Sequence, residues 1–347
     1  MNSVRLSICI CTINRADFIK QTLESIIPQM TEEVELVLVD SSSNTETEEI
    51  VREFRGQCDN LCYVRDLERW GFGKAYAKAV EKAQGDYCWL FTDDDLVRAG
   101  AVAAILESSR KDYSLIVVNA EVRNEDLGKL LEDRRVPVSK DRVYSPKPDD
   151  QDRLLADTGM YLTFIGAVVI RRDLWNQRIK EEYFPSMFIH MIIIFASRLP
   201  GDALLIADPW IVIRYGNALW RPKSFGIWMF EFPSLVWSFD EFEDWAKERV
   251  ERREPWRRLR RLLMIRAMDR YSVEQYNLWL KPRLKPGLNK LLARAIASAP
   301  VTPLNLLGQL FLLLTGKVPG LIWLDLRAWR TEQLRRRRSK VLHATRP

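Results

Sequence analysis

The sequence predicts an α/β fold in which a mostly parallel sheet is flanked by helices. Short apolar runs alternate with segments of helical periodicity between residues 4 and 118, and polar residues follow several of the runs directly. Such alternation is typical of strand, crossover helix and next strand in a parallel sheet. Because right-handed crossovers bring the ends of parallel strands to one edge, we expect these polar residues to meet there.

The first strand is expected at 4–11, where the run Val4-Arg5-Leu6-Ser7-Ile8-Cys9-Ile10-Cys11 is almost wholly apolar. Asn14 can cap the helix that follows, because its side chain can accept from free amide groups of the first turn. Gly85 suits the end of the third helix, where a left-handed residue is common. Further strands are expected at 34–40, 61–65, 87–92 and 115–118, and helices at 16–29, 45–54, 73–84 and 99–109.

The second half of the chain has a different character. Residues 120–158 are polar and read as a surface excursion, whereas 161–170 and 187–196 are apolar again. From Trp228 onward the pattern is helical and rich in tryptophan. Residues 304–314 form an apolar stretch of eleven residues, which is shorter than the roughly 20 residues that cross a bilayer. We therefore expect two parts, 1–225 for the sheet domain and 226–347 for a basic helical extension.

Charge separates the same two parts. Residues 1–250 hold 31 Lys and Arg against 41 Asp and Glu, whereas residues 251–347 hold 22 against 6, a net charge of +16. The end of the chain carries Arg335-Arg336-Arg337-Arg338. This asymmetry indicates a polyanionic partner for the second part, either a membrane surface or nucleic acid. No motif that reads nucleic acid accompanies it, so we favour an anionic membrane.

Five cysteines and the first residues bear on the compartment. The cysteine count is odd, and Cys9, Cys11 and Cys88 lie inside apolar runs, which favours buried free thiols in a reducing cytosol. Met1 to Arg5 lead straight into the first strand without the apolar core of a signal peptide. We expect a cytoplasmic protein that is peripheral on the inner face of the plasma membrane.

Three consecutive carboxylates, Asp93-Asp94-Asp95, end the apolar run Tyr87-Cys88-Trp89-Leu90-Phe91-Thr92. Like charges repel, and three of them at the tip of a buried strand are best explained by a cation. Hard oxygen ligands of this kind suit Mg²⁺ or Mn²⁺, which in turn bind phosphates. The carboxyl ends of strands are also where open α/β sheets bind ligands. The alternative is a solvated acidic turn before Leu96.

Residues 7–15, 37–40 and 85–95 together resemble the inverting family 2 glycosyltransferases of GT-A fold in order, spacing and context. Within that family, Thr92-Asp93-Asp94-Asp95, Ile165-Gly166 and Arg214-Tyr215-Gly216-Asn217 look most like the abequosyltransferase-type enzymes of bacterial O-antigen assembly. The resemblance implies a Rossmann-like GT-A sheet and a nucleotide-sugar donor. It also implies a single displacement on a glycan acceptor. The basic, tryptophan-containing C-terminal part favours a lipid-linked acceptor, which we expect to be carried by a polyprenyl diphosphate.

The resemblance also implies roles for residues at the strand ends. Thr12, Asn14 and Arg15 would wrap the donor nucleotide. Asp40 would contact the base, unless it caps the turn that follows. Asp93 and Asp95 would form the metal-binding pair, with Asp95 on the ion that bridges the donor phosphates and Asp93 or Asp94 on the ribose or a metal-bound water.

Four further positions belong to the expected site. Lys74 would offer charge to a phosphate, unless it is an exposed lysine at a helix start. The usual Glu-Asp pair that supplies the general base is missing. His190 is the candidate base or a ligand near the metal, with a buried core histidine as the alternative. Asp157, Glu181 and Glu182 are the other candidate bases. On the acceptor side we expect Gly166, Tyr215 and Trp220, although core packing is the alternative for the aromatic pair.

Three other functions remain open. A sugar nucleotidyltransferase would share the strand-end site, but Thr12-Ile13-Asn14-Arg15 lacks the glycine-rich basic loop that such enzymes place after the first strand. A nucleic-acid-binding protein would not need the carboxylates. A relative that binds sugar nucleotides without catalysis fits the missing Glu-Asp pair.

Overall fold

The computed structural model describes residues 4–68, 71–218, 221–316 and 321–327. The chain divides into two units. Unit 1 comprises residues 1–217 and 235–251, and unit 2 comprises residues 218–234 and 252–347. The division is therefore discontinuous, because residues 218–234 group with the C-terminal part and 235–251 return to the sheet unit. A single boundary near residue 225 does not describe it.

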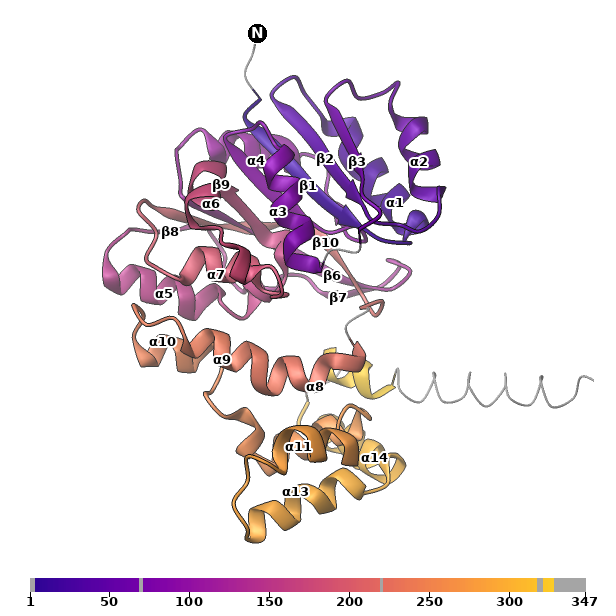
Figure 1. Cartoon of the computed structure of the whole chain (residues 1–347), viewed down its shortest axis with the longest axis vertical. Helices are drawn as coiled ribbons and strands as arrows, with labels where there is room; N and C mark the ends of the chain where they lie inside the picture. Colours follow the sequence, from indigo (N-terminus) through magenta and orange to yellow (C-terminus); the bar gives the residue numbers. More distant parts are fainter. Residues whose placement is uncertain (1–3, 69–70, 219–220, 317–320, 328–347) are drawn as a thin grey trace, which may run out of the picture. The chain divides into compact units, whose positions relative to one another are not determined.

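Unit 1 is built on a ten-stranded sheet with the order β3-β2-β1-β4-β9-β6-β10-β5, while β7 pairs with β6 and β8 pairs with β10 (Figure 1). The strands are β1 (Leu6–Thr12), β2 (Val34–Asp40), β3 (Leu61–Arg65), β4 (Tyr87–Phe91), β5 (Leu96–Val97), β6 (Leu115–Asn124), β7 (Leu130–Glu132), β8 (Arg142–Tyr144), β9 (Val168–Arg171) and β10 (Ala203–Tyr215). β1 pairs in parallel with β2 and β4, β2 with β3, and β6 with β10. The mostly parallel α/β sheet is confirmed.

The helices of unit 1 connect these strands. They are α1 (Ala16–Ile26), α2 (Glu46–Phe54), α3 (Phe72–Lys82), α4 (Ala101–Ser109), α5 (Pro148–Thr158), α6 (Arg172–Arg178), α7 (Ile189–Phe195) and α10 (Asp244–Val250). Every residue of β2 and β4 is buried, as expected for strands with helices on both faces. Tyr76 of α3 donates to the carbonyl of Phe91 at 2.8 Å, which fixes this helix to the end of β4.

Two stretches differ from the sequence prediction. Residues 120–158 do not form a plain surface excursion, because β6 continues to Asn124 and β7, β8 and α5 follow. The apolar run at 161–170 is mostly short 3₁₀ turns, and only its last part is strand β9. β9 runs antiparallel between β4 and β6, so it inserts into the sheet rather than extending its edge.

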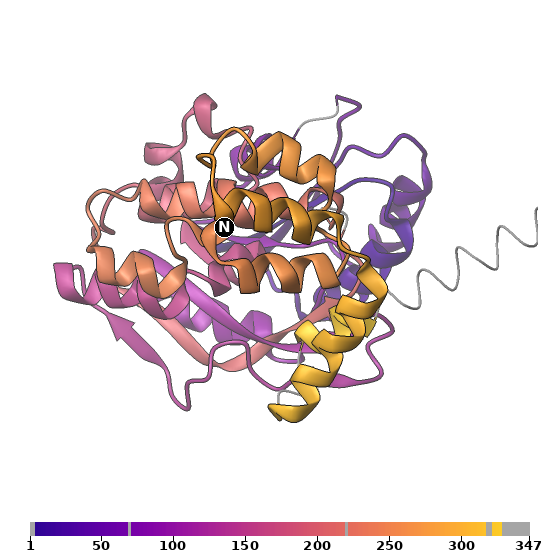
Figure 2. The same cartoon turned by 90° about the horizontal axis from the view of Figure 1, so that it is seen from below.

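Unit 2 is helical and aromatic, as its tryptophan-rich sequence predicts. Its main helices are α11 (Leu259–Ala267), α13 (Leu288–Ser298) and α14 (Val301–Leu314), which appear in orange and yellow in Figure 2. Stacked rings fill the core, with Phe225 on Tyr271 at 4.7 Å and Phe230 on Trp279 at 4.8 Å between centroids. The unit therefore has a hydrophobic core of its own.

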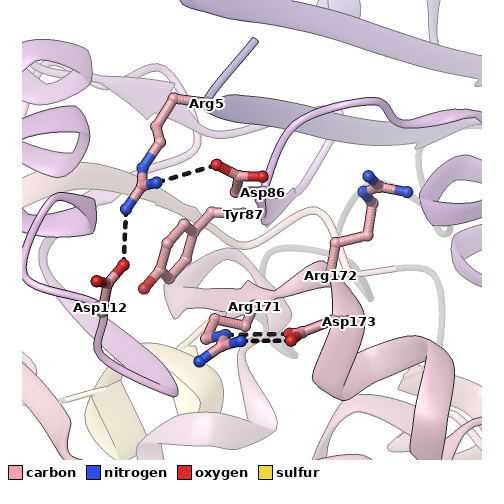
Figure 3. Close-up of a pocket in the computed structure, with 7 residues that line it drawn as sticks. All are labelled: Arg5, Asp86, Tyr87, Asp112, Arg171, Arg172 and Asp173. Carbon is pink, nitrogen blue, oxygen red and sulfur yellow. Dashed lines mark hydrogen bonds and ion pairs between the residues drawn. The ribbon is translucent and has the colours of Figure 1, made fainter. Parts of the chain in front are cut away.

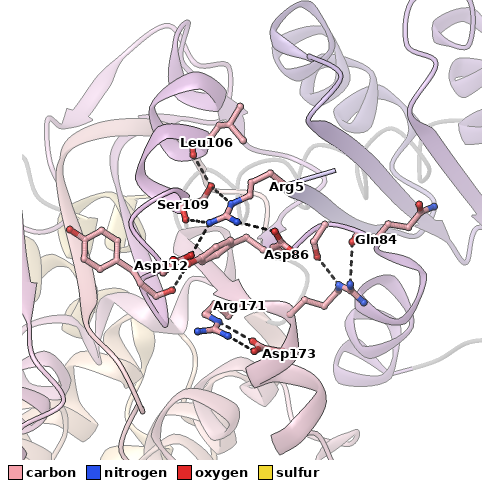
Figure 4. A network of polar contacts seen from close by, with 12 residues as sticks. Arg5, Gln84, Asp86, Leu106, Ser109, Asp112, Arg171 and Asp173 are labelled. Carbon is pink, nitrogen blue, oxygen red and sulfur yellow. Dashed lines mark hydrogen bonds and ion pairs between the residues drawn. The ribbon is translucent and has the colours of Figure 1, made fainter. Parts of the chain in front are cut away.

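An ion-pair network joins the amino ends of the central strands of unit 1. Arg5, just before β1, donates to Asp86 and Asp112 at 2.9 Å each and to the carbonyl of Ser109 at 2.6 Å (Figure 4). These partners lie before β4, at the end of α4 and before β6, so one guanidinium links three strand starts. The network borders a pocket of about 390 Å³ that is lined by Arg5, Asp86, Tyr87, Asp112, Arg171, Arg172 and Asp173 (Figure 3).

We expect Arg5→Ala to lower the free energy of unfolding by about 2 kcal/mol, because it leaves the carbonyl of Ser109 and two carboxylates without their shared donor. Urea denaturation followed by tryptophan fluorescence measures this. Arg55→Ala, at an exposed position just after α2, is the control and should change stability by less than about 0.5 kcal/mol. Equal effects of the two substitutions would contradict a structural role for the network.

Candidate functional site

The candidate site lies where the parallel strands of unit 1 end. β1 ends at Thr12, which pairs in register with Asp40 at the end of β2. β4 ends at Phe91, just before the three carboxylates, and β10 ends at Tyr215. The predicted meeting of these segments at one sheet edge is therefore observed. Hydrogen bonds and ion pairs among them define a carboxylate cluster: Thr12, Arg15, Asp93, Asp94, Asp95, Arg214 and Asn217.

Arg15 is the cation closest to the outer part of the cluster. It starts α1, and its side chain is only 13% exposed. Its guanidinium lies 2.7 Å from a carboxyl oxygen of Asp94 and 3.3 Å from one of Asp93. The plane of the guanidinium also packs over the ring of Phe18, at 4.7 Å from its centroid. Arg15 thus bridges two of the three carboxylates.

Asp93 points inward. Its Oδ2 accepts a hydrogen bond from the hydroxyl of Thr12 at 2.8 Å, and the residue is 8% exposed. Burial and the neighbouring charge of Asp94 raise the pKa of Asp93 to about 7, against the lowering effect of Arg15. The charged form of Asp93 is therefore disfavoured when no ligand is bound.

Asp95 is also directed inward, and both of its carboxyl oxygens have partners. Oδ1 accepts from the backbone N–H of Arg214 at 2.7 Å, and Oδ2 accepts from the hydroxyl of Thr92. The residue is 3% exposed, and burial raises its pKa well above the usual range. The structure thus places Asp95 as a link between the ends of β4 and β10.

Asp94 is the carboxylate turned toward the outside. Its side chain remains 14% exposed, and Oδ2 accepts from Arg15 and from the amide of Asn217, each at 2.7 Å. Thr22 of α1 donates to the backbone carbonyls of Asp93 and Asp95, which fixes the turn that presents these side chains.

Arg214 and Asn217, which belong to the segment that resembles the abequosyltransferase-type enzymes, lie in the carboxylate cluster. Arg214 is 7% exposed and donates to the carbonyls of Asp94 and Glu125 and to the side chain of Gln21. The segment from Arg214 to Asn217 was noticed in the sequence. Its position at the end of β10, beside β4 residues more than a hundred positions earlier, had no local signal.

Asn14 and Asp40 organise the loops beside the cluster. Asn14 has a φ of 52°, in the left-handed region that asparagine tolerates, and its side chain accepts from the N–H and hydroxyl of Ser43. Asp40 is fully buried, and its oxygens accept from the N–H of Ser42 and the hydroxyl of Tyr63 at 2.8 Å each. This is the turn-capping arrangement that was the alternative for Asp40.

Lys74 is half-buried near the start of α3. Only glycine fits at the preceding position, Gly73, because a Cβ there would lie 2.6 Å from the carbonyl oxygen of Phe184. Residues 181–186 thus reach the start of α3. Glu181 and Glu182 are exposed on that segment, whereas Asp157 is on α5 and accepts from Tyr144 at 2.9 Å. Within the described residues, none of these three carboxylates forms a hydrogen bond or ion pair with the carboxylate cluster.

The predicted role of His190, as the catalytic base or a ligand near the metal, needs a correction. It lies on α7 and is 1% exposed, and its Nε2 is 2.7 Å from the carbonyl oxygen of Leu162. Nε2 therefore carries the hydrogen, and Nδ1 has no hydrogen-bond partner among the described residues. Burial lowers the pKa of His190 to about 4, so the ring is neutral near pH 7. A sealed ring cannot reach an acceptor hydroxyl, which agrees with the core-histidine alternative.

Of the residues expected on the acceptor side, Gly166 and Tyr215 lie within the described residues. Gly166 is buried behind β4, where its carbonyl accepts from the indole of Trp89 at 2.8 Å, so it does not face an acceptor. Tyr215 is half-buried at the end of β10. Trp220 and the basic run at 335–338 lie outside the described residues.

Residues 7–177 match the family model described as Glycosyl transferase family 2. Over 231 residues the chain is 23% identical to the abequosyltransferase RfbV of Salmonella typhimurium, covering 63% of this chain and 69% of that protein. It is also 23% identical over 183 residues to the GalNAc(5)-diNAcBac-PP-undecaprenol beta-1,3-glucosyltransferase of Campylobacter jejuni, covering 52% of this chain and 56% of that protein. The chain thus spans less than two thirds of the second relative.

A crystal structure of TarS residues 1–349 from S. aureus superposes with a TM-score of 0.57 at 16% identity, covering 97% of this chain and 92% of that one. A structure of the same protein in complex with UDP-GlcNAc gives 0.53. At this identity the likeness shows the fold alone. The GT-A-like fold and the family resemblance predicted from the sequence are confirmed.

The unusual pKa of His190 predicts a pH dependence of stability. Between pH 6.5 and 4 the unfolded chain binds a proton at this residue and the folded chain does not, so the free energy of unfolding falls as pH falls through this range. The loss from His190 reaches about 3 kcal/mol at the acid end. Urea denaturation at several pH values should show a smaller slope for His190→Gln, which keeps an N–H donor but does not titrate. Identical slopes would mean that the ring is accessible to protons in the folded state.

Proposed function

From the premise that this chain carries a family 2 glycosyltransferase domain over residues 7–177, we propose that it transfers a sugar from a nucleotide-sugar donor to a hydroxyl of a glycan. The observation that carries the proposal is the carboxylate cluster, in which three acids at the end of β4 meet Arg15 and Arg214. A polar edge at the carboxyl ends of parallel strands is where such sheets bind nucleotides.

The cluster fits a divalent cation that a donor would help to hold. Asp93 and Asp94 offer hard oxygen ligands, and a cation beside them would favour the charged form of Asp93, whose pKa is raised first by burial and then by the charge of Asp94. No group of three or more His, Cys, Asp and Glu surrounds a metal position within the described residues. Mg²⁺ and Mn²⁺ commonly bind through one or two carboxylates, with substrate phosphates completing the shell. When bound, such an ion would neutralise the departing nucleoside diphosphate.

We assign the metal-facing role to Asp94 with Asp93, rather than to Asp95. Asp94 is the least buried of the three, and its Oδ2 is the oxygen that Arg15 and Asn217 bind. Asp93 shares Arg15 with it, whereas Asp95 is a positioning residue that joins Thr92 to the backbone N–H of Arg214. Arg15 would bridge Asp93 and Asp94 and face the phosphates, and Asp40 with Asn14 would keep the adjacent loops in place.

The proposed acceptor and catalytic base rest on observations outside the carboxylate cluster. The name of the Campylobacter relative includes an undecaprenol diphosphate. This supports a polyprenyl-linked glycan acceptor at the cytoplasmic face of a membrane. For the base, the exposed carboxylates Glu181 and Glu182 stand on the segment that reaches the start of α3, so we prefer them to the sealed His190. Anomeric inversion follows from the family resemblance.

Nucleotide binding tests the donor site directly. We expect one of UDP, GDP, CDP and dTDP to raise the Tm in the presence of Mn²⁺. The gain should reach about 2.7 kcal/mol at one hundred times Kd, or about 5–10 °C for a unit of this size. Asp94→Asn, which keeps the shape and removes the charge, should abolish the shift. Asp59→Asn, at an exposed position before β3, should retain it. No shift with any nucleotide would contradict the donor site, and a shift independent of metal would contradict the metal assignment alone.

Catalysis distinguishes a transferase from a relative that only binds donors. With the nucleotide sugar selected above, wild-type protein should release nucleoside diphosphate slowly to water and faster with an acceptor. Glu181→Gln and Glu182→Gln, made separately, should show which carboxylate takes the proton, with a loss of about 10²–10⁴-fold in kcat and unchanged nucleotide binding for the base. Tight donor binding without any turnover would favour the non-catalytic alternative.

A further inference from the structure

Helices α13 and α14 of unit 2 carry a surface of exposed apolar side chains. On α14, Leu306, Leu307, Leu310, Leu313 and Leu314 are 46–79% exposed, and on α13 Leu288 and Leu291 are 69% and 66% exposed. At 100° per residue, the five leucines of α14 cover one continuous side of the helix. We call these seven residues the leucine face.

The opposite side of α14 is packed, so the helix is held in place with the leucine face outward. Leu312 is 3% exposed against Ala267 and Leu326. The buried amide of Asn305 donates to the carbonyls of Ala267 and Leu326 at 3.0 and 2.9 Å. A single exposed leucine needs no explanation, but a row of them on a fixed helix marks a surface that binds something apolar.

Charge indicates what that partner is. Residues 275–324 contain no Asp or Glu and six Lys or Arg. Five of these cations, at positions 281, 283, 285, 290 and 294, lie on or just before α13. The partner must therefore combine an apolar interior with a negatively charged surface, which describes an anionic lipid bilayer. A symmetric dimer through the same face would bring the cations of two copies together.

α14 alone is too short to cross a bilayer, so we expect the leucine face to lie in the bilayer surface. α14 has 14 residues, about 21 Å of helix, against the roughly 30 Å of a bilayer core. Within the described residues no single helix is long and apolar enough to span a membrane. α13 and α14 reach the length only together, with a bend of 100° between them. Two short helices with exposed leucines and nearby cations match helices that insert in the interface plane.

We propose that the leucine face of α13 and α14 is the surface by which this chain docks on an anionic membrane. The inference rests on the proposed function in one respect: docking would hold the donor site near a polyprenyl-linked acceptor. It assigns the contact to these two helices rather than to the basic run at 335–338.

Vesicle sedimentation of the full chain tests the proposal. Wild-type protein should sediment with vesicles of phosphatidylcholine and phosphatidylglycerol, less with phosphatidylcholine alone, and less at high salt. The double variant Leu307→Glu/Leu310→Glu should lower the partition by about tenfold or more, because two inserted leucines become charged. The matched control Leu67→Glu/Leu130→Glu changes two leucines of unit 1 that are 71% and 47% exposed, and should sediment as wild type.

Two further measurements separate loss of membrane docking from loss of the donor site and from dimerisation. Nucleotide-induced stabilisation of the Leu307→Glu/Leu310→Glu variant should equal that of wild type, which separates failure of docking from failure of the donor site. Light scattering gives the oligomeric state without lipid. Equal sedimentation of wild type and the variant, or no binding of wild type to anionic vesicles, would overturn the proposal. So would a wild-type dimer that the variant converts to monomers, because a second copy would then cover the face.

Discussion

The crowding of three carboxylates at one strand end is the constraint on which the rest of unit 1 depends. Like charges this close are stable only with cations beside them, and here the cations come from far along the chain. Arg15, which follows β1, pairs with the carboxylate of Asp94, 79 positions away. Arg214, in the last strand, donates from its guanidinium to the backbone carbonyl of Asp94, 120 positions away. Removing one partner of a buried ion pair typically costs 3–5 kcal/mol. Assembly of the site and closure of the sheet are therefore coupled.

Exposure alternates along the turn after β4: Asp93 and Asp95 are buried, whereas Thr92 and Asp94 are partly exposed. The sequence identifies an Asp-x-Asp pattern, but it does not show which of its residues face outward. That arrangement depends on Arg214, whose backbone N–H donates to Asp95 from the far end of the sheet domain. Local sequence thus predicts that a carboxylate site exists, and long-range pairing sets how deeply each carboxylate is buried.

The contrast between local sequence pattern and long-range pairing also separates the parts of the fold that the sequence could predict from those it could not. The elements between residues 6 and 118 follow a clear alternation of apolar runs and helical periodicity, and they are observed within a few residues of their expected bounds. No strand was expected at 203–215, yet β10 pairs with β6 along most of its length. Asp208-Pro209 interrupts the apolar run there, and the pairing register shifts between Ile206 and Ile211. Likewise β9 enters the sheet antiparallel, which no local pattern specifies.

The two ends of the sheet differ in how their charged side chains are paired. The pocket of about 390 Å³ at the amino ends contains three arginines and three aspartates, so its formal charges balance. Arg5 and Arg171 bind aspartates, and Arg172 binds the carbonyls of Gln84 and Gly85, so the lining cations already have partners. At the carboxyl ends, Arg15 pairs with Asp93 and Asp94, and Asp95 accepts from Thr92 and from the backbone N–H of Arg214. Burial, followed by the charge of Asp94, raises the pKa of Asp93 to about 7, so its charged form is disfavoured without a ligand. A cation bound there would favour the charged form, whereas a ligand at the amino ends would first have to break existing ion pairs. The carboxylate cluster is therefore the better candidate for a site that binds a cation and its ligand.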